Sequence, residues 1–368
     1  MKSNPRSANQ KLYLYRLRLC LIIILSMILT GCETVSYYYQ AIEGQISILN
    51  QRQDIADVLA DPQTSAETRA KLELVLEIRK YAAEQLRLPV NDSYSQYVDV
   101  EREYVVWNVF AAPAFSVSPK TWCYPIAGCV AYKGFFAEAD AQAHAAKLAT
   151  EGFDVYVGGV AAYSTLGWFE DPILNTFLYR SDAGLVGLLI HELAHQQLYV
   201  QNDSAFNESF ASTVEILGLE QWLIENDRPE QIALMATHRQ RREEFVEVVL
   251  KHREKLAAMY AMDLAPTEKT QRKMRLKQEL LDNYQQLKNS WGGYSGYDRW
   301  FEGPLNNAQL STVATYNHWV NSFKALFAQS NKDWPTFYQR SQELAKQEPS
   351  LREESLEKLS VDGANYRL

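Results

Sequence analysis

The sequence predicts an α+β fold that is mostly helical and contains a small mixed sheet. Residues 66–88 place apolar side chains near a 3.6-residue spacing, which is typical of an amphipathic helix, and Pro89 follows them. Between residues 94 and 163, runs rich in Val, Tyr, Phe and Trp are separated by turn residues, which is typical of strands. From Pro172 onward, almost every segment again has a helical pattern.

The order of these elements predicts helical regions on either side of a core that contains the strands. Strands are expected at residues 104–110, 130–136 and 153–163, with one helix between them at 137–150. Acidic and basic side chains interleave through residues 226–290, which indicates a solvated helical hairpin rather than a basic surface for nucleic acid. We therefore expect five parts: a signal peptide (1–31), an N-terminal helical segment (32–93), a core (94–225), the charged hairpin (226–290) and a C-terminal helical region (291–368) that completes the site.

The composition is that of a folded, acidic protein. Hydrophobic residues make up 47% and charged residues 22% of the 368 residues, so the chain can bury a substantial core. The formal net charge is −8 at pH 7. Because phosphate binding depends on clustered Lys and Arg, this acidity argues against a nucleic-acid partner. It also argues against electrostatic adhesion to anionic lipid.

Residues 1–31 have the features of an export signal. All their charged residues are basic, and the apolar run 19–29 is too short for a transmembrane helix, which needs roughly 20 residues. The small residues before Cys32 resemble the lipobox of bacterial lipoproteins, and the alternative is an ordinary signal peptide. The resemblance implies cleavage before Cys32 and a lipid anchor on it, attaching the chain to the membrane. Because Glu33 rather than Asp follows, we expect the outer membrane, facing the periplasm.

Two of the remaining cysteines are close in sequence. Cys123 and Cys129 are six positions apart and flank Pro125 and Gly128, which are typical turn residues. In an oxidising compartment this spacing predicts a local disulfide that closes a turn. A metal site is the alternative, but the segment contains no histidine.

The strongest functional signal is the sequence HELAH at residues 191–195. On a helix, His191 and His195 lie on one face at positions i and i+4, so both imidazoles can reach one cation. Zinc lowers the pKa of a bound water to about 7, and the carboxylate of Glu192 is close enough to accept its proton. The spacing therefore predicts a zinc site with Glu192 as a catalytic base.

A third metal ligand is expected on the next helix. Residues 201–204 form a natural turn, and a second amphipathic helix follows with Glu208 in its first turn. Two histidines and one glutamate leave a coordination position open for water or substrate. The alternative for Glu208 is a carboxylate favoured by the helix dipole. Glu215, two turns later, is either a residue that orients a ligand histidine or an ordinary helix residue.

HELAH followed by NESFA (207–211) resembles the gluzincin branch of HExxH zinc metallopeptidases, whose third ligand is a glutamate on the next helix. The chain is also similar to a family of predicted bacterial aminopeptidase lipoproteins. The shared segments are TWCYPIAGCVAYKGFF (121–136), GGVAAYSTLGWFEDPI (158–173) and NNAQLSTVATY (306–316). One position departs from the thermolysin-like pattern, in which an Asp follows the glutamate ligand by four residues. This chain has Ser212 there, so Glu215 is the substitute partner for His191.

The resemblance implies a zincin-like metallopeptidase core that holds one Zn²⁺ per chain. The implied activity is zinc-dependent removal of N-terminal residues from peptide substrates, through attack of a water molecule that the metal activates. One alternative is an endopeptidase that acts on envelope proteins or peptidoglycan peptides. Another is a non-catalytic zinc-binding lipoprotein with a docking role.

Several further residues are candidates for substrate contacts. Tyr316, on a C-terminal helix, is the candidate donor to the developing oxyanion, with His318 as the second choice. The zincin comparison makes residues 153–165 an edge strand to which a peptide could add, although an ordinary buried strand is the alternative. Glu170 or Asp171 could bind a substrate's α-ammonium group. The remaining histidines are expected at the surface: His144, His238 and His252.

Overall fold

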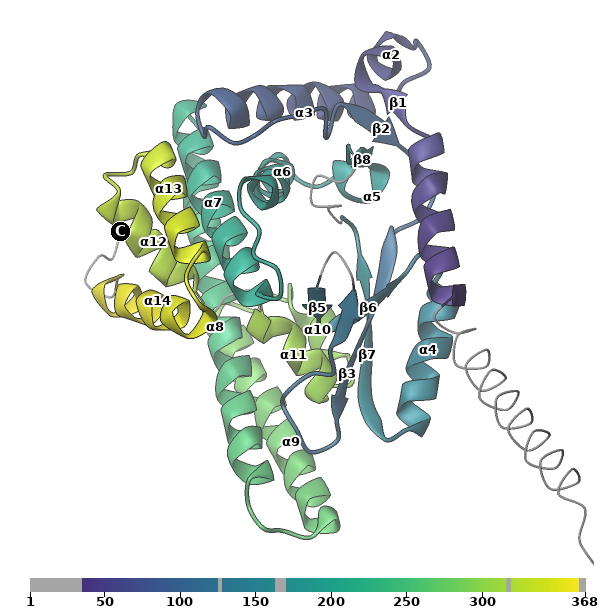
Figure 1. The fold of residues 1–368 in the computed structure, drawn as a ribbon, viewed down its shortest axis with the longest axis vertical. Helices are drawn as coiled ribbons and strands as arrows, with labels where there is room; N and C mark the ends of the chain where they lie inside the picture. The colour runs from purple at the N-terminus through teal and green to yellow at the C-terminus, as the bar shows by residue number, and fades with distance from the viewer. Residues whose placement is uncertain (1–34, 125–127, 163–169, 316–318, 364–368) are drawn as a thin grey trace, which may run out of the picture. The chain divides into compact units, whose positions relative to one another are not determined.

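The computed structural model describes residues 35–124, 128–162, 170–315 and 319–363 (Figure 1). The chain divides into two units, residues 1–51 and 52–368. In the first unit, residues 35–50 form a helix, and the expected signal peptide and Cys32 lie outside the described residues. Within the described ranges, no helix combines the length and the hydropathy that crossing a membrane requires.

The second unit begins with two helices and a small mixed sheet. Helix α2 spans Ile55–Ala60, and α3 spans Ala66–Glu84, where Ser65 accepts a hydrogen bond from the Thr68 N–H and caps the first turn. The mixed sheet has the strand order β1–β2–β8, with β2 and β8 parallel. Its strands are too short for the sequence pattern to mark them: Gln53–Asp54 (β1), Gln96–Val98 (β2) and Ile173–Leu174 (β8).

The predicted strands form a different sheet, which is antiparallel rather than mixed. Its order is β6–β3–β7, so β7 lies at one edge. The strands span Val106–Pro113 (β3), Tyr132–Phe135 (β6) and Phe153–Val160 (β7). Helix α4 (Glu138–Thr150) packs on this sheet, as Figure 1 shows. A further hairpin is formed by Trp122–Tyr124 (β4) and Gly128–Val130 (β5).

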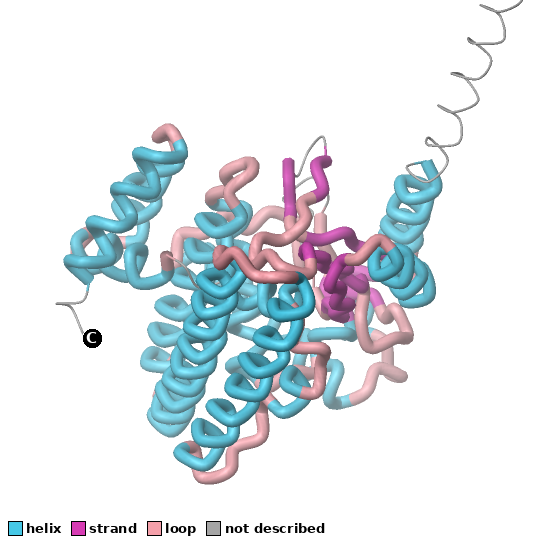
Figure 2. Tube along the Cα trace, turned by 90° about the horizontal axis from the view of Figure 1, so that it is seen from below, coloured by secondary structure: helices cyan, strands magenta, loops and turns pink. Residues whose placement is uncertain are grey.

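Helices make up most of the remaining chain, and Figure 2 shows the strands gathered in one region with helices around it. The expected charged hairpin is present as α8 (Pro229–Tyr260) and α9 (Pro266–Ser290). The other helices are α5 (Asn175–Leu178), α6 (Asp182–Gln197), α7 (Ser204–Glu225), α10 (Asp298–Phe301), α11 (Asn307–Thr315), α12 (Val320–Gln329), α13 (Trp334–Ala345) and α14 (Pro349–Gly363).

One side of the charged hairpin is buried, although its sequence is mostly polar. A stripe of buried residues runs along α8 at alternating spacings of three and four: Phe245, Val249, His252, Leu256 and Met259. The surface prediction for His252 is therefore wrong, because its position is part of this stripe. Burial lowers the pKa of its imidazole to about 4, so it is neutral at pH 7. His238 is exposed as expected, and His144 is half-buried against Phe135.

The segment that begins at residue 306 fastens the C-terminal helices to the antiparallel sheet. The Asn306 side chain donates to the Val155 carbonyl of β7 at 2.8 Å. The Asn307 side chain donates to the carbonyls of Pro113 and Ala114 at 3.0 Å each, and it accepts a hydrogen bond from the Tyr260 hydroxyl. These two polar residues therefore hold the start of α11 against the antiparallel sheet.

Candidate metal and active site

The site is built on two helices joined by a short turn. Ser181 caps helix α6, where its side chain accepts from the Gly184 N–H, and Asp203 caps α7, where its side chain accepts from the Phe206 N–H at 3.0 Å. The buried Asn207 side chain bonds both the N–H and the carbonyl of Val200 at 2.8 Å. These contacts fix the turn, so the start of α7 lies against the end of α6.

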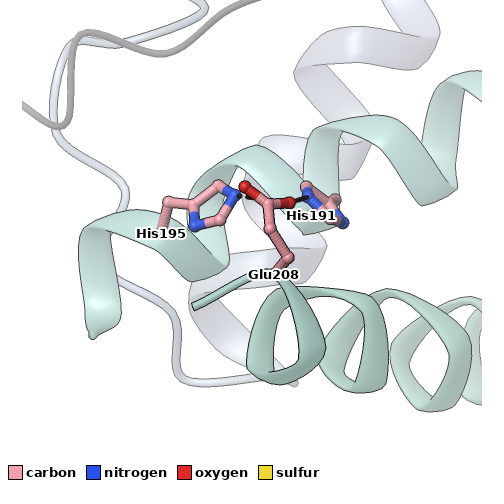
Figure 3. Close-up of side chains that lie close together, drawn as sticks. All are labelled: His191, His195 and Glu208. Carbon is pink, nitrogen blue, oxygen red and sulfur yellow. Dashed lines mark ion pairs between the residues drawn. The ribbon is translucent and has the colours of Figure 1, made fainter. Parts of the chain in front are cut away.

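Three potential metal ligands converge across this helix pair (Figure 3). The Nε2 atom of His191 lies 3.4 Å from Glu208 Oε2, and the Nε2 atom of His195 lies 3.8 Å from the same oxygen. One ligand atom from each residue lies within 4.8 Å of the other two. Ligand atoms about 2.0–2.2 Å from a zinc ion lie up to about 4 Å apart, so the arrangement could hold one ion.

Glu215 fixes the orientation of one of these potential ligands. Its Oε2 atom lies 3.0 Å from His191 Nδ1. When Nδ1–H donates to this carboxylate, the Nε2 lone pair faces Glu208. Helices α6 and α7 must approach closely for this contact: a Cβ on Gly187 would lie 3.3 Å from Glu215 Oε1 and from Leu219. Gly187 thus leaves room for the carboxylate that holds His191.

The protonation states suit a site for a cation. Burial by itself lowers the pKa of His191, but hydrogen bonds with Glu208 and Glu215 outweigh it and raise that pKa to about 10. In the metal-free site a proton on His191 therefore supplies positive charge. Burial lowers the pKa of His195 to about 4, which leaves it neutral. Burial raises the pKa of Glu208, but the two histidines outweigh this effect and the net shift is downward.

The chemistry of these groups fits a divalent metal. Two imidazole nitrogens and one carboxylate oxygen form the donor set of an open zinc site, and the metal would displace the proton of His191. The three side chains keep some exposure to solvent: 13% for His191, 8% for His195 and 22% for Glu208. A metal bound by these side chains would therefore be accessible to a substrate from the solvent.

Glu192 is half-buried and neighbours both histidines on α6. Burial has the largest effect on its pKa, and nearby carboxylates, with Glu208 first, add to it. Together they outweigh the opposing effect of His191 and raise the pKa to about 7. A carboxyl group with a pKa near 7 can both accept and return a proton at neutral pH.

A family model described as Putative aminopeptidase matches residues 36–356. The chain belongs to this family. No curated protein and no solved structure matches it significantly. The family's description makes peptides the expected class of substrate, and the match includes both helices of the candidate site.

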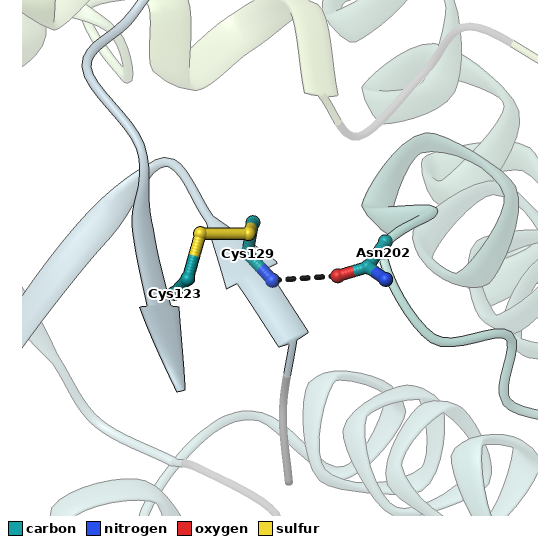
Figure 4. The surroundings of a disulfide bond; sticks show 3 residues. All are labelled: Cys123, Cys129 and Asn202. Carbon is teal, nitrogen blue, oxygen red and sulfur yellow. Dashed lines mark hydrogen bonds between the residues drawn. A yellow bond between two sulfur atoms is a disulfide. The ribbon is translucent and has the colours of Figure 1, made fainter. Parts of the chain in front are cut away.

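The disulfide hairpin of this family member contacts the turn between the two site helices (Figure 4). Cys123 and Cys129 form a disulfide across β4 and β5. The backbone N–H of Cys129 donates to Asn202 Oδ1 at 2.7 Å. Gly128 has a φ of +73°, and a Cβ there would lie only 2.2 Å from the same oxygen. The hairpin therefore supports the turn that leads into α7.

The structure describes some, but not all, of the residues that were predicted to contact substrate. Tyr316 and His318 lie outside the described residues. The backbone N–H of Trp319, just after them, donates to Ser209 Oγ at 3.0 Å, next to Glu208 on α7. Glu170 is exposed and forms a long ion pair with Arg52, whose nitrogen lies 4.0 Å from the carboxylate.

Asp171 is 4% exposed and lies close enough to Glu192 to contribute to its raised pKa. The sequence did not mark Tyr94, which is 2% exposed and whose backbone N–H donates to the Asp171 carbonyl. No periodicity or motif distinguishes Tyr94 from the other tyrosines among the 22 in the chain. The pairing of β2 with β8 brings it next to Asp171.

Proposed function

We propose that the chain is a zinc-dependent aminopeptidase with a zincin-like core. The observation that carries this proposal is the convergence of His191, His195 and Glu208, whose ligand atoms lie within 4.8 Å of one another, beside the half-buried Glu192. A structural zinc site has four protein ligands and no need of a neighbouring base, whereas three ligands leave a position open. The family match favours aminopeptidase among the peptidase classes.

The metal would be held by His191, His195 and Glu208. Zinc bound there would act as a Lewis acid that polarises the scissile carbonyl and lowers the pKa of an attacking water. Glu215 keeps His191 in the tautomer that presents Nε2. The hydrogen bonds of Asp203 and Asn207 keep Glu208 at the position where it faces both histidines.

Glu192 would move the proton during hydrolysis. Its carboxylate accepts a proton from the attacking water and then delivers it to the nitrogen of the leaving amine. Its raised pKa suits this exchange, because the protonated form is accessible at neutral pH. The oxyanion needs a donor in addition to the metal, and we propose Tyr316 for that role.

Cleavage of matched peptides tests this function. Peptides with a free and an acetylated amino terminus would be incubated with the zinc-loaded protein, and products would be identified by mass spectrometry. Release of single N-terminal residues from the free peptide alone supports the proposal. Internal cleavage of both peptides would instead indicate an endopeptidase, and no cleavage by a fully zinc-loaded protein would contradict a peptidase function.

The N-terminal sequence supports a separate proposal about location. We propose that Cys32 carries a lipid that anchors the protein to the bacterial envelope, facing the periplasm, most simply at the outer membrane because Glu33 follows it. Metabolic labelling with palmitate tests this: the wild-type chain should carry label, and Cys32→Ala should not. Label that persists in Cys32→Ala would contradict the assignment.

A further inference from the structure

The hairpin of β4 and β5 has few backbone contacts to hold it. Each strand has three residues, and among the described strands the two pair with each other as a separate sheet. An isolated two-stranded hairpin is at best marginally stable in water. The register places Cys123 opposite Cys129, so the disulfide joins the middle pair of this short ladder. The order of the hairpin therefore depends on the crosslink.

The end of this hairpin fits closely against the turn between α6 and α7, as Figure 4 shows for Cys129 and Asn202. The Cys129 N–H donates to Asn202 Oδ1 at 2.7 Å. Gly128 is buried, and a Cβ there would lie 2.2 Å from the same oxygen and 3.1 Å from the Gln201 side chain. Movement of β5 away from β4 would break these contacts, so the position of β5 and the conformation of the turn are linked.

The turn decides where Glu208 lies. Asn202 has a φ of +67°, in the left-handed region, which asparagine adopts more readily than most residues. Asp203, the next residue, caps α7, and the Asn207 side chain bonds both backbone groups of Val200 across the turn. Glu208 follows directly. A change at Asn202 therefore reaches the start of α7 and the carboxylate that faces the two histidines.

The disulfide is accessible to thiol–disulfide exchange. Cys123 is exposed and Cys129 is partly exposed. A protein dithiol that reduces this bond supplies two electrons and two protons through a mixed disulfide, leaves both cysteines as thiols and becomes a disulfide itself. Oxidation by a protein disulfide is the reverse exchange. The cytosol keeps cysteines reduced, whereas an exported chain meets oxidising conditions.

We propose that the Cys123–Cys129 disulfide is a redox-sensitive switch that sets the zinc affinity of the site through Asn202. In the oxidised chain, the hairpin holds the turn and Glu208 is placed for the metal. In the reduced chain, β5 leaves the turn and zinc binds more weakly. Because coupling is reciprocal, bound zinc in turn favours the disulfide. The switch rests on the metal site of the proposed function and adds its regulation: a chain that has not been exported holds zinc weakly.

Zinc competition on matched variants tests the switch. A chromogenic chelator would give the zinc affinity of wild type and of Cys123→Ala/Cys129→Ala, which cannot form the bond and adds no thiol ligands. We expect a loss of about 3- to 10-fold, below the 10- to 100-fold that removing a direct partner of a ligand typically costs. Asn202→Gly, which tolerates the same φ and keeps the disulfide, should lose a similar factor. The variant with all three changes should lose no more than either, because both act through one contact.

Hydrogen exchange in the metal-free protein gives a second readout. The Val200 N–H donates to Asn207 Oδ1, so it reports the order of the turn. It should exchange faster in Cys123→Ala/Cys129→Ala, and faster in wild type after a phosphine has reduced the disulfide. Asp333→Ala is the control, because it removes an exposed cap on α13 and lowers stability elsewhere. It should leave zinc affinity and Val200 exchange unchanged.

Two outcomes would overturn the switch. One is wild-type zinc affinity and Val200 exchange in the chain without the disulfide. The other is a loss in the combined variant equal to the product of the separate losses, which would mean that the disulfide and Asn202 act independently. Circular dichroism would establish that each variant is folded. Failure of the proposed function is distinguishable, because wild type then binds no zinc, whereas Val200 exchange still reports whether the disulfide controls the turn.

Discussion

The Nδ1 atom of His191 lies 3.0 Å from the Oε2 atom of Glu215, and this contact links the two helices that supply the candidate metal ligands. It occupies the nitrogen of His191 that does not face Glu208. In the thermolysin-like pattern, an aspartate four residues after the glutamate ligand bonds to this nitrogen of the histidine. The corresponding residue in this chain is Ser212. Glu215 is one turn further along α7, on the same face as Glu208, and reaches His191 from there.

Replacing Glu215 should weaken metal binding while leaving the ligands in place. Removing a carboxylate that orients a ligand histidine typically costs 10- to 100-fold in metal affinity, so we expect about that loss for Glu215→Ala. Competition with a chromogenic zinc chelator measures it. The control is Glu220→Gln, which changes a carboxylate on the same helix whose side chain is 40% exposed, and it should have the wild-type affinity. Equal affinity in Glu215→Ala and wild type would show that the contact does not support the site.

Glu192→Gln should separate metal binding from turnover. The amide has the shape of the carboxylate but cannot accept a proton, so zinc content should stay at the wild-type level while kcat falls by about 10²- to 10⁴-fold. Zinc analysis and peptide cleavage on the same sample would check both. Turnover at the wild-type rate would exclude Glu192 as the proton acceptor.

The rate should depend on pH through Glu192. Its pKa is raised to about 7, mainly by burial and then by nearby carboxylates, and only the deprotonated form accepts a proton. The rate constant kcat/KM should therefore fall as the pH drops below this pKa. A bound divalent cation favours the charged form and moves the fall to pH 7 or below. Profiles of kcat/KM between pH 5 and 9, with zinc saturating throughout, would reveal it, and a rate that rises as the pH drops from 7 to 5 would contradict the assignment.

Asp203 should be important for stability because its side chain both caps a helix and forms an ion pair. Its Oδ1 caps α7 through the Phe206 N–H, and its Oδ2 pairs with Arg352, whose side chain is 6% exposed. Asp203→Ala removes the cap and leaves the buried guanidinium of Arg352 without a carboxylate partner, which should lower the free energy of unfolding by about 3–5 kcal/mol. Asp203→Asn keeps the cap and should lose less. Urea unfolding of both variants measures the difference, and losses under 1 kcal/mol in both would argue against this role.

The sequence pattern identified those parts of the site that local spacing determines. His191 and His195 are one helical turn apart, and the turn at 201–204 is marked by polar residues, so the α6–α7 pair followed from periodicity. The sequence also predicted the charged hairpin. It did not predict the buried stripe on α8, because His252 lies among charged residues in the sequence. Burial there depends on the packing of α8 against its neighbours.

The Tyr94–Asp171 pair could not be predicted, because it depends on strands of three and two residues that are distant in sequence. Strands this short give no alternation of apolar and polar side chains. The same reason explains why the strands of the mixed sheet were not predicted: the runs rich in Val, Tyr, Phe and Trp form the antiparallel sheet, and the mixed sheet forms elsewhere.

The most direct test of the central claim is the metal content of the purified protein. Wild type and Glu208→Ala would be dialysed against metal-free buffer, exposed to an equimolar mixture of divalent metals, and analysed by inductively coupled plasma mass spectrometry. We expect close to one zinc per wild-type chain and a strongly reduced content in Glu208→Ala. A well-folded wild-type protein that retains no metal, or a Glu208→Ala variant with the same zinc content, would contradict the site formed by His191, His195 and Glu208.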